Sequence, residues 1–329
     1  MNIAVVGATG VVGQAFLTVL EDSPLSIENL YLYASARSAG QTALFREREY
    51  RVEALGETSF RHGAIDYALF SAGGAVSRTY APLAAAAGAI VVDNSSAWRM
   101  DADVPLVVPE VNIDDAHRAP KGIIANPNCS TIQAVLPLKA LADRYGLKRV
   151  VFTTYQAVSG AGAKGIRDLE ATLRGEPPAH FPYTIAKSCI PHIDLFADDG
   201  YTKEELKMVN ETRKILHLPA LPVTATCVRV PIFNGHSVAI IAETEQPFEI
   251  AAVRRRLAEF PGIIVQDNVA ETVYPVAELA SGRDEVFVGR IRRDLSQPNS
   301  LHIWCVADNI RKGAAANAVQ IVEKLSLEP

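Results

Sequence analysis

Cys129 stands where a thiol could act as a nucleophile. It follows the turn Asn126-Pro127-Asn128, which ends a short apolar run, and helical periodicity extends from Ile132 to Tyr145. We expect Cys129 at or beside a helix N-terminus, where the helix dipole and the N–H groups favour the thiolate. Such a thiolate could attack an acyl carbon. The alternative is a buried, unreactive cysteine, which is our expectation for Cys189, Cys227 and Cys305.

An arginine and a histidine lie on either side of a hairpin signal. Asn234-Gly235 separates two apolar runs, Cys227–Phe233 and Ser237–Thr244, and predicts a two-residue turn. Arg229 and His236 would then share one face of the sheet, with roughly 13 Å of strand between their backbones. Both could reach opposite ends of one small carboxylate substrate, with His236 as acid or base if the cysteine is close. The alternative is a surface histidine at the turn tip.

A glycine-rich turn follows the first apolar run. The run Asn2–Val6 leads into GATGVVG at residues 7–13, and a helical pattern extends from Val11 to Glu21. Such a turn lets a pyrophosphate approach the backbone and meet the N–H groups of a helix N-terminus. The spacing is GxxGxxG rather than GxGxxG, and a tight turn without a ligand is the alternative. The residues expected at the nucleotide are Gly7, Thr9, Gly10, Val11, Val12 and Gly13.

The end of the second predicted strand favours NADP over NAD. A NAD site usually has an acidic residue there, which binds the ribose 2′-hydroxyl. Residues 34–40 read ASARSAG and contain no carboxylate. Arg37, between Ser35 and Ser38, suits a 2′-phosphate because a guanidinium fork matches phosphate geometry. The alternative is a solvated loop arginine.

Three more charged residues are candidates for binding a substrate. Arg99 comes just after a predicted strand at 90–93, at the ligand edge of an α/β sheet, and could clamp phosphate or carboxylate. Glu211 and Lys214 share a face of a helix that begins with the capping box Thr202-Lys-Glu-Glu205. Spacing alone favours a solvated ion pair for these two residues.

These residues lie in two different patterns of secondary structure. Up to residue 128, short apolar runs alternate with helical stretches such as Ser77–Ala87, which predicts a doubly wound parallel sheet. Beyond residue 146, longer alternating runs with helices at Thr202–His217 and Glu249–Phe260 predict an α+β domain with a mixed, largely antiparallel sheet. Arg311–Leu325 predicts a terminal helix. The strand candidates are Asn2–Val6, Leu30–Ala34, Tyr67–Ser71, Ile90–Asp93, Ile123–Ala125, Arg149–Val158, Cys227–Phe233, Ser237–Thr244, Val286–Arg292 and Leu301–Ala307.

Length and composition fit a two-domain globular protein. The chain has 329 residues, 49% hydrophobic and 21% charged, which excludes a disordered chain. With 32 basic and 37 acidic residues the net charge is −5, which argues against bulk binding to nucleic acid or acidic membranes. The N-terminus lacks a signal peptide's basic segment, and the longest apolar run, Tyr80–Val92, is too short for a membrane span. The cysteine spacing fits neither a zinc site nor a disulfide framework, so we expect a cytoplasmic protein without a metal.

Several segments together resemble the aspartate-β-semialdehyde dehydrogenase family over nearly the whole chain. Enzymes that act on N-acetylglutamyl phosphate share the architecture, but their cysteine typically stands in a PGCYPT segment. Glyceraldehyde-3-phosphate dehydrogenase shares the Cys/His logic in a more distant sequence. The matching segments are VVGATGVVG, SARSAG, FSAGG, VVDNSSAWRM, PLVVPEVN, ANPNCST, TYQAVSGAG, VNETRKIL, VRVPIFNGHS and ADNIRKGAAANA.

The resemblance implies a reaction and a role for each matching residue. Cys129 would attack L-aspartyl 4-phosphate to form a thioacyl enzyme, and NADPH would reduce it to L-aspartate 4-semialdehyde, for lysine (diaminopimelate), threonine and methionine biosynthesis. His236 would be the acid/base and Gln156 would orient the acyl group. The remaining implied roles are Asn128 beside the cysteine, Arg229 for the α-carboxylate, Glu211 for the ammonium, Arg99 and Lys214 for the phosphate, and Ser159, Gly160 and Asn309 near the nicotinamide.

The resemblance also implies a domain division and a partner. An NADP-binding Rossmann-like domain over residues 1–128 would be completed by a C-terminal helix at 311–329. A catalytic domain over residues 129–310 would form the face of a homodimer. The competing hypotheses are a reductase for another acyl phosphate such as N-acetylglutamyl phosphate, a nucleotide sensor without catalysis, and a structural protein.

Overall fold

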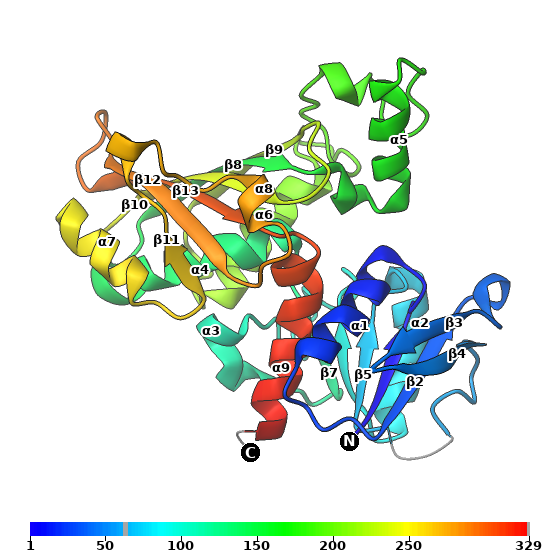
Figure 1. Ribbon diagram of the computed structural model, residues 1–329. Coiled ribbons are helices and arrows are strands. Elements are labelled where there is room, and N and C mark those ends of the chain that lie inside the picture. Colours follow the sequence, from blue (N-terminus) through cyan, green and yellow to red (C-terminus); the bar gives the residue numbers. More distant parts are fainter. Residues whose placement is uncertain (62–64, 328–329) are drawn as a thin grey trace. The chain divides into compact units, whose positions relative to one another are not determined.

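The computed structural model describes residues 1–61 and 65–327, which form two compact units (Figure 1). Unit 1 contains Met1–Pro127 and the chain from Ala314 onward, and unit 2 contains Asn128–Gly313. Asn128 is therefore the first residue of unit 2, and the division lies within one residue of the boundary that the resemblance implies. No helix in the described part of the chain is long and apolar enough to cross a membrane.

Unit 1 is built on a seven-stranded sheet with the order β3-β4-β2-β1-β5-β6-β7. All neighbouring strands pair in parallel except β3 and β4, which form an antiparallel edge hairpin that the sequence analysis missed. The strands are β1 (Asn2–Val6), β2 (Asn29–Ala34), β3 (Thr42–Phe45), β4 (Arg48–Ala54), β5 (Tyr67–Phe70), β6 (Ile90–Asp93) and β7 (Ile123–Ala125). The helices are α1 (Val11–Asp22), α2 (Gly74–Ala86), α3 (Pro109–Asn112) and α9 (Ala316–Leu327).

The core of unit 1 joins the two ends of the chain. Ile3 and Val5 of β1, Phe16 of α1 and Val319 of α9 belong to one buried apolar cluster. α2 packs against β5, β6 and β7. Residues 311–315, predicted as the start of the terminal helix, form a π-helical turn before α9. An extra residue in such a turn re-aims the backbone, and π-turns often occur at functional sites.

Unit 2 is built on a six-stranded sheet with the order β11-β12-β13-β10-β8-β9. The β11/β12 and β8/β9 pairs are parallel, and the other three pairs are antiparallel. The strands are β8 (Arg149–Gln156), β9 (Val223–Arg229), β10 (His236–Glu243), β11 (Ile263–Val265), β12 (Val286–Arg293) and β13 (Ser300–Ala307). The helices are α4 (Cys129–Tyr145), α5 (Ala163–Leu173), α6 (Lys203–Ile215), α7 (Ile250–Ala258) and α8 (Ala277–Ala280).

Three helices cover the sheet of unit 2. α4 packs against β10 and β13, α6 packs against β9, and α7 packs against β11 and β12. Thr202 caps α6 through the predicted capping box with Glu205. The predicted fold class is thereby confirmed: a doubly wound, mostly parallel sheet and a second domain with a mixed, largely antiparallel sheet.

The predicted hairpin around Asn234-Gly235 is wrong. β9 and β10 are not neighbours, because β8 lies between them and pairs with both. β9 ends at Arg229, and the chain crosses the end of β8, where Val158 N–H donates to the carbonyl of Ile232. The turn signal was local, whereas the pairing of β8 with both strands depends on long-range packing.

Candidate active site

Cys129 is the first residue of α4, as the sequence predicted. Asn128 is the N-cap, and its side-chain oxygen accepts hydrogen bonds from the backbone N–H groups of Ser130 (3.0 Å) and Thr131 (3.3 Å). This cap holds the first turn, and thereby the cysteine, in place. A β-carbon added to Gly313 would lie 2.8 Å from Cβ of Cys129, so the backbone of the π-turn passes directly beside the cysteine.

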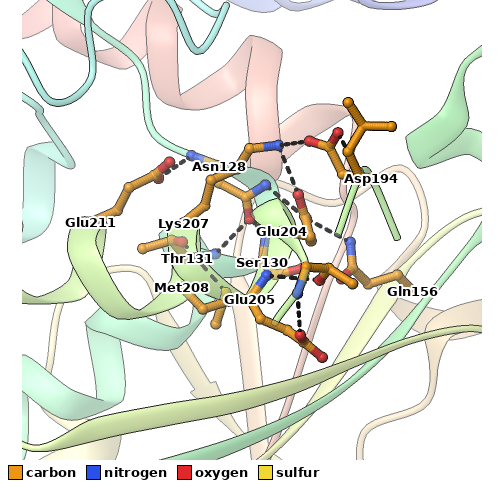
Figure 2. Close-up of polar contacts among 12 residues, drawn as sticks. Asn128, Ser130, Thr131, Gln156, Asp194, Glu204, Glu205, Lys207, Met208 and Glu211 are labelled. Carbon is orange, nitrogen blue, oxygen red and sulfur yellow. Dashed lines mark hydrogen bonds and ion pairs between the residues drawn. The ribbon is translucent and has the colours of Figure 1, made fainter. Parts of the chain in front are cut away.

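Two carboxylates of α6 hold Asn128 (Figure 2). Glu211 accepts the Asn128 backbone N–H at 2.6 Å, and Glu204 accepts its side-chain amide at 2.8 Å. Both glutamates are buried. Sequence reasoning missed Glu204, although a spacing of seven residues places it on the same helix face as Glu211.

Gln156 ends β8 and meets the same glutamate. Its Oε1 accepts from the hydroxyl of Thr154 at 2.9 Å, and its Nε2 donates to Glu204 at 3.0 Å. The two bonds fix which way the amide points. The amide nitrogen also lies 3.5 Å from Nε2 of His236.

His236 is fully buried, so the alternative of a surface histidine is wrong. Its Nδ1 accepts the backbone N–H of Ala157 at 3.0 Å. The neutral ring therefore carries its proton on Nε2, on the side of Gln156. Burial, and then the charge of Arg229, lower the pKa of His236 well below its usual value. The ring is neutral at pH 7.

Arg229 lies close to His236 without the predicted hairpin. Arg229 pairs with Gln156 in the β8/β9 register, and its guanidinium donates to the carbonyl of Ala157 at 2.6 Å. A β-carbon added to Gly160 would lie 2.8 Å from Nη1 of Arg229 and 3.2 Å from Nε2 of His236. The two side chains thus converge on the end of β8, although their strands are not neighbours.

Asn309 and Ser159 lie together beside this cluster. The amide of Asn309 donates to the Ser159 hydroxyl at 3.0 Å, and its oxygen accepts the backbone N–H of Gly235 at 2.8 Å. Asp308, which the sequence analysis did not single out, accepts from the Asn234 amide at 2.7 Å. These bonds hold the turn that leads into His236.

Glu211 is not part of a solvated surface pair, because it is only 1% exposed. Lys214, one turn further along α6, is partly exposed. Glu211 faces the start of α4, and the two residues thus lie in different environments despite their spacing of three. The expectation of a solvated ion pair is wrong for the glutamate.

The glycine-rich loop of unit 1 has the form that a nucleotide requires. Gly7 has φ of +90°, and a β-carbon there would lie 2.5 Å from the carbonyl oxygen of Ser71. A β-carbon on Gly13 would lie 2.1 Å from the Gly7 carbonyl oxygen, so the first turn of α1 packs directly on the loop. Gly10 is the exposed N-cap of α1 and has no side chain with which to cap the helix. A phosphate group fits such a helix start.

The two candidate arginines of unit 1, Arg37 and Arg99, differ in exposure. Arg37 is exposed, in a short 3-10 helix (Ala36–Ser38) directly after β2. Arg99 is 8% exposed, and its guanidinium donates to the backbone carbonyls of Asn126 (3.0 Å) and Asn94 (2.9 Å). Arg37 can thus reach a ligand in solution, whereas part of the Arg99 guanidinium is already used within the unit.

None of the four cysteines, all of which the structure describes, forms a disulfide. Cys227 and Cys305 are buried, and burial raises the pKa of both thiols. Cys189 is exposed, so our expectation of a buried thiol is wrong there. Within residues 1–61 and 65–327, no three His, Cys, Asp or Glu side chains are grouped to hold a metal ion.

Known proteins share both units of this chain. Residues 2–119 match the family model for the semialdehyde dehydrogenase NAD binding domain, and residues 138–312 match that for the dimerisation domain. The aspartate-semialdehyde dehydrogenase of Aquifex aeolicus is 56% identical over 99% of this chain and 98% of its own length. The chain belongs to the aspartate-semialdehyde dehydrogenase family. It is therefore an oxidoreductase, and the resemblance found in the sequence is confirmed.

Solved structures of the aspartate-semialdehyde dehydrogenase family agree. Aspartate semialdehyde dehydrogenase II from Vibrio cholerae, in a complex with ASA, is 44% identical with a TM-score of 0.93, over 99% of this chain and 98% of its own. The enzyme from Candida albicans with NADP is 27% identical with a TM-score of 0.78, over 99% and 98% of the two chains. The fold of both units is thus that of the family.

Proposed function

We propose that this chain reduces L-aspartyl 4-phosphate to L-aspartate 4-semialdehyde with NADPH, through a thioacyl intermediate on Cys129. One observation carries the proposal. Hydrogen bonds in unit 2 connect Asn128, beside the cysteine, through Glu204 to Gln156, and the amide nitrogen of Gln156 lies 3.5 Å from Nε2 of His236. Names of relatives support the substrate, and this cluster supports the chemistry.

The first half of the reaction needs a nucleophile and a leaving group. The Cys129 thiolate would attack the acyl carbon, and the bond from that carbon to the phosphate oxygen would break, releasing inorganic phosphate. Arg99 and Lys214 are proposed to bind the phosphate, Arg229 the α-carboxylate and Glu211 the ammonium. Two cations for a phosphate, one for a carboxylate and one anion for an ammonium complement this substrate.

The second half of the reaction needs groups that orient the acyl oxygen of the thioester and stabilise the negative charge that develops on it. Bound NADPH would supply the hydride that reduces the thioester to a thiohemiacetal. Gln156 is proposed to orient the acyl oxygen, and neutral His236 to stabilise the negative charge on it through Nε2–H and to manage its proton. Collapse of the thiohemiacetal would release the aldehyde and restore the thiolate.

The residues of unit 1 fit NADP. Gly7, Thr9, Gly10, Val11, Val12 and Gly13 form a turn and helix start for the pyrophosphate. Ser35, Arg37 and Ser38 would hold the 2′-phosphate, and no carboxylate follows β2 before residue 47. In unit 2, Ser159, Gly160 and Asn309 are proposed to lie near the nicotinamide. The NADP in the Candida albicans structure supports this choice.

We further propose that the protein is a cytoplasmic homodimer that serves lysine (diaminopimelate), threonine and methionine biosynthesis. The match to a dimerisation domain supports the homodimer. The cysteines support a reducing compartment, because none of the four, all in the described part of the chain, is in a disulfide.

The reverse reaction tests the proposed function. Purified protein would be incubated with L-aspartate 4-semialdehyde, phosphate and NADP while NADPH absorbance is followed. We expect phosphate-dependent NADPH formation in the wild type, and its loss in Cys129→Ala with NADP binding retained. An enzyme that binds NADP but turns over only N-acetylglutamate semialdehyde would overturn the aspartyl assignment.

A further inference from the structure

Glu204 is a buried carboxylate to which the proposed reaction assigns no part. One oxygen, Oε1, accepts hydrogen bonds from two side-chain amides, those of Asn128 (2.8 Å) and Gln156 (3.0 Å). The other oxygen accepts from Lys207 at 3.1 Å, and Lys207 also donates to Asp194 at 2.8 Å. Figure 2 shows these side chains gathered around Glu204.

The site favours a charged carboxyl at this position. Burial alone would raise the pKa of Glu204, but the charge of Lys207 and the hydrogen bonds from Asn128 and Gln156 outweigh burial and hold the pKa below its usual value. A charged acceptor makes shorter and stronger hydrogen bonds than a neutral one. Glu204 can thus restrain two amides from two different elements at once.

Each of those amides has a separate part in the proposed reaction. Asn128 caps the helix that carries Cys129, and Gln156 would orient the acyl group. The amide of Gln156 also lies at 3.5 Å from the ring of His236. An error in placement of the order of 1 Å at a reacting group can cost about a hundredfold in rate.

We propose that Glu204 is a positioning residue, whose Oε1 sets the orientation of Asn128 and Gln156 relative to each other without touching the substrate. This inference rests on the proposed function for the roles of the two amides. It predicts that the site requires one acceptor oxygen that faces both amides. The negative charge strengthens these two hydrogen bonds, but a neutral acceptor in the same place should restore most of the rate.

Glu204→Gln separates the oxygen from the charge. The new amide has one oxygen and one NH₂ group. If NH₂ faces Lys207, a donor meets an ammonium, and if NH₂ turns the other way, it faces the donors of Asn128 and Gln156. Both arrangements set donor against donor, and we expect kcat to fall at least about tenfold. KM for phosphate should stay within about threefold, because no phosphate contact changes.

Lys207→Met is the second change, and it predicts a rescue. Without the ammonium, the NH₂ group of the glutamine introduced by Glu204→Gln can face outward, and its oxygen can again accept both amides. We expect kcat of the double variant Glu204→Gln/Lys207→Met to return to within about threefold of Lys207→Met alone. Glu205→Gln is the matched control. Glu205 is the next buried carboxylate and accepts the N–H groups of Thr202 and Cys227, so its loss should lower stability and leave kcat nearly unchanged.

NMR gives a readout that does not need turnover. The side-chain amide signals of Asn128 and Gln156, assigned by their loss in the two alanine variants, should shift in Glu204→Gln and stay in place in Glu205→Gln. The inference is overturned if the signals do not move, if kcat of Glu204→Gln stays within threefold of wild type, or if Lys207→Met restores nothing. A wild-type protein inactive on aspartate semialdehyde would instead reject the proposed function, while the amide signals still decide whether Glu204 restrains the two amides.

Discussion

The helices α1 and α4 begin in the same way and are capped in different ways. Each follows a short strand in the chain and a tight turn, α1 after β1 and α4 after β7. The N-cap of α1 is Gly10, which is exposed and has no side chain. The N-cap of α4 is Asn128, which is buried and caps the helix itself.

The difference shows two uses of one structural element. A helix start with a bare glycine leaves its N–H groups for an external anion, and here that anion is proposed to be a pyrophosphate. A helix start closed by asparagine and held by Glu204 and Glu211 leaves no such role and instead fixes one residue, Cys129, in place. At the start of α1, a bound ligand would supply the acceptors that stabilise the N–H groups. At the start of α4, side chains of the protein itself supply them.

Removal of the internal cap should have the largest effect on stability. Asn128→Ala removes two hydrogen bonds to the first turn of α4 and leaves Glu204 with one donor fewer. The loss of a cap costs about 1 kcal/mol and a buried group without its partner about 1–3 kcal/mol. We expect the free energy of unfolding to fall by about 2–4 kcal/mol in urea titrations.

Asn128→Asp is the matched control for that cap. Aspartate caps a helix as well as asparagine does, but it lacks the amide that donates to Glu204. It should restore the cap, but its carboxylate would repel that of Glu204. Because protonation relieves this repulsion in the folded state, the stability of the variant should rise relative to wild type as the pH falls. A variant Asn128→Ala that is as stable as wild type would show that α4 does not depend on its own cap.

Arg37→Ala should weaken the external ligand of unit 1 and leave the fold intact. The guanidinium is exposed, so its removal should hardly change the melting temperature. A charged hydrogen bond is worth about 1.5–3 kcal/mol, which corresponds to a rise of about 10- to 150-fold in the Kd for NADP. Titration calorimetry with NADP and NAD measures both constants. Equal weakening of the two dinucleotides would contradict a contact to the 2′-phosphate.

The buried histidine should make the stability of the protein depend on pH. The pKa of His236 is lowered by burial and by Arg229, so below about pH 6.5 the unfolded chain binds a proton that the folded chain does not. Stability contributed by the neutral ring is therefore complete above this pH and is lost as the pH falls. The loss is at most about 1.4 kcal/mol per pH unit.

Comparison with His236→Asn isolates this contribution. Urea titrations at pH 7.5, 6.5 and 5.5 should show a steeper loss of stability for the wild type than for the variant. Parallel curves would mean that the ring takes up its proton in the folded protein as easily as in the unfolded one.

Helices and strands could be predicted well from the sequence, because the capping and turn residues that mark their ends lie close to them in the chain. The capping box at Thr202 and the turn before Cys129 each place a helix start correctly. The order of strands is a long-range property, and the turn signal at Asn234-Gly235 therefore led to a hairpin that does not exist. The edge hairpin of β3 and β4 was missed, since β4 (REYRVEA) is mostly exposed and carries four charged residues, so it contains no apolar run.

The site was only partly predictable from the sequence. Cys129 could be singled out from its turn and helix, but the contact of His236 with Ala157 depends on which strands pair. Glu204 is one of many glutamates, and only packing against α4 and β8 distinguishes it. Its spacing from Glu211 was the one signal available, and that spacing is meaningful only once the buried face of α6 is known.

Gly10→Ser tests the comparison between the N-caps of α1 and α4, and it is the substitution for which we expect the smallest change in stability. Serine at an N-cap accepts a backbone N–H, and it is favoured over glycine by a few tenths of a kcal/mol. The φ of Gly10 is −81°, which serine adopts without strain, although its β-carbon would lie 3.3 Å from the Gly7 carbonyl oxygen. We expect the protein without ligand to become slightly more stable and to bind NADP roughly three- to tenfold more weakly, because the hydroxyl competes for the same N–H groups.

Gly10→Ala separates this competition from crowding. Alanine adds the β-carbon without the hydroxyl, and it is a poor N-cap, so the ligand-free protein should lose stability. If capping decides the outcome, Gly10→Ser must weaken NADP binding more than Gly10→Ala does, while it stabilises the ligand-free fold. If both substitutions weaken binding equally, the crowding at Gly7 decides, and the start of α1 is open to the ligand for reasons of space. The starts of α1 and α4 would then differ because the turn before α1 leaves room for a ligand, and not because α1 lacks a capping side chain.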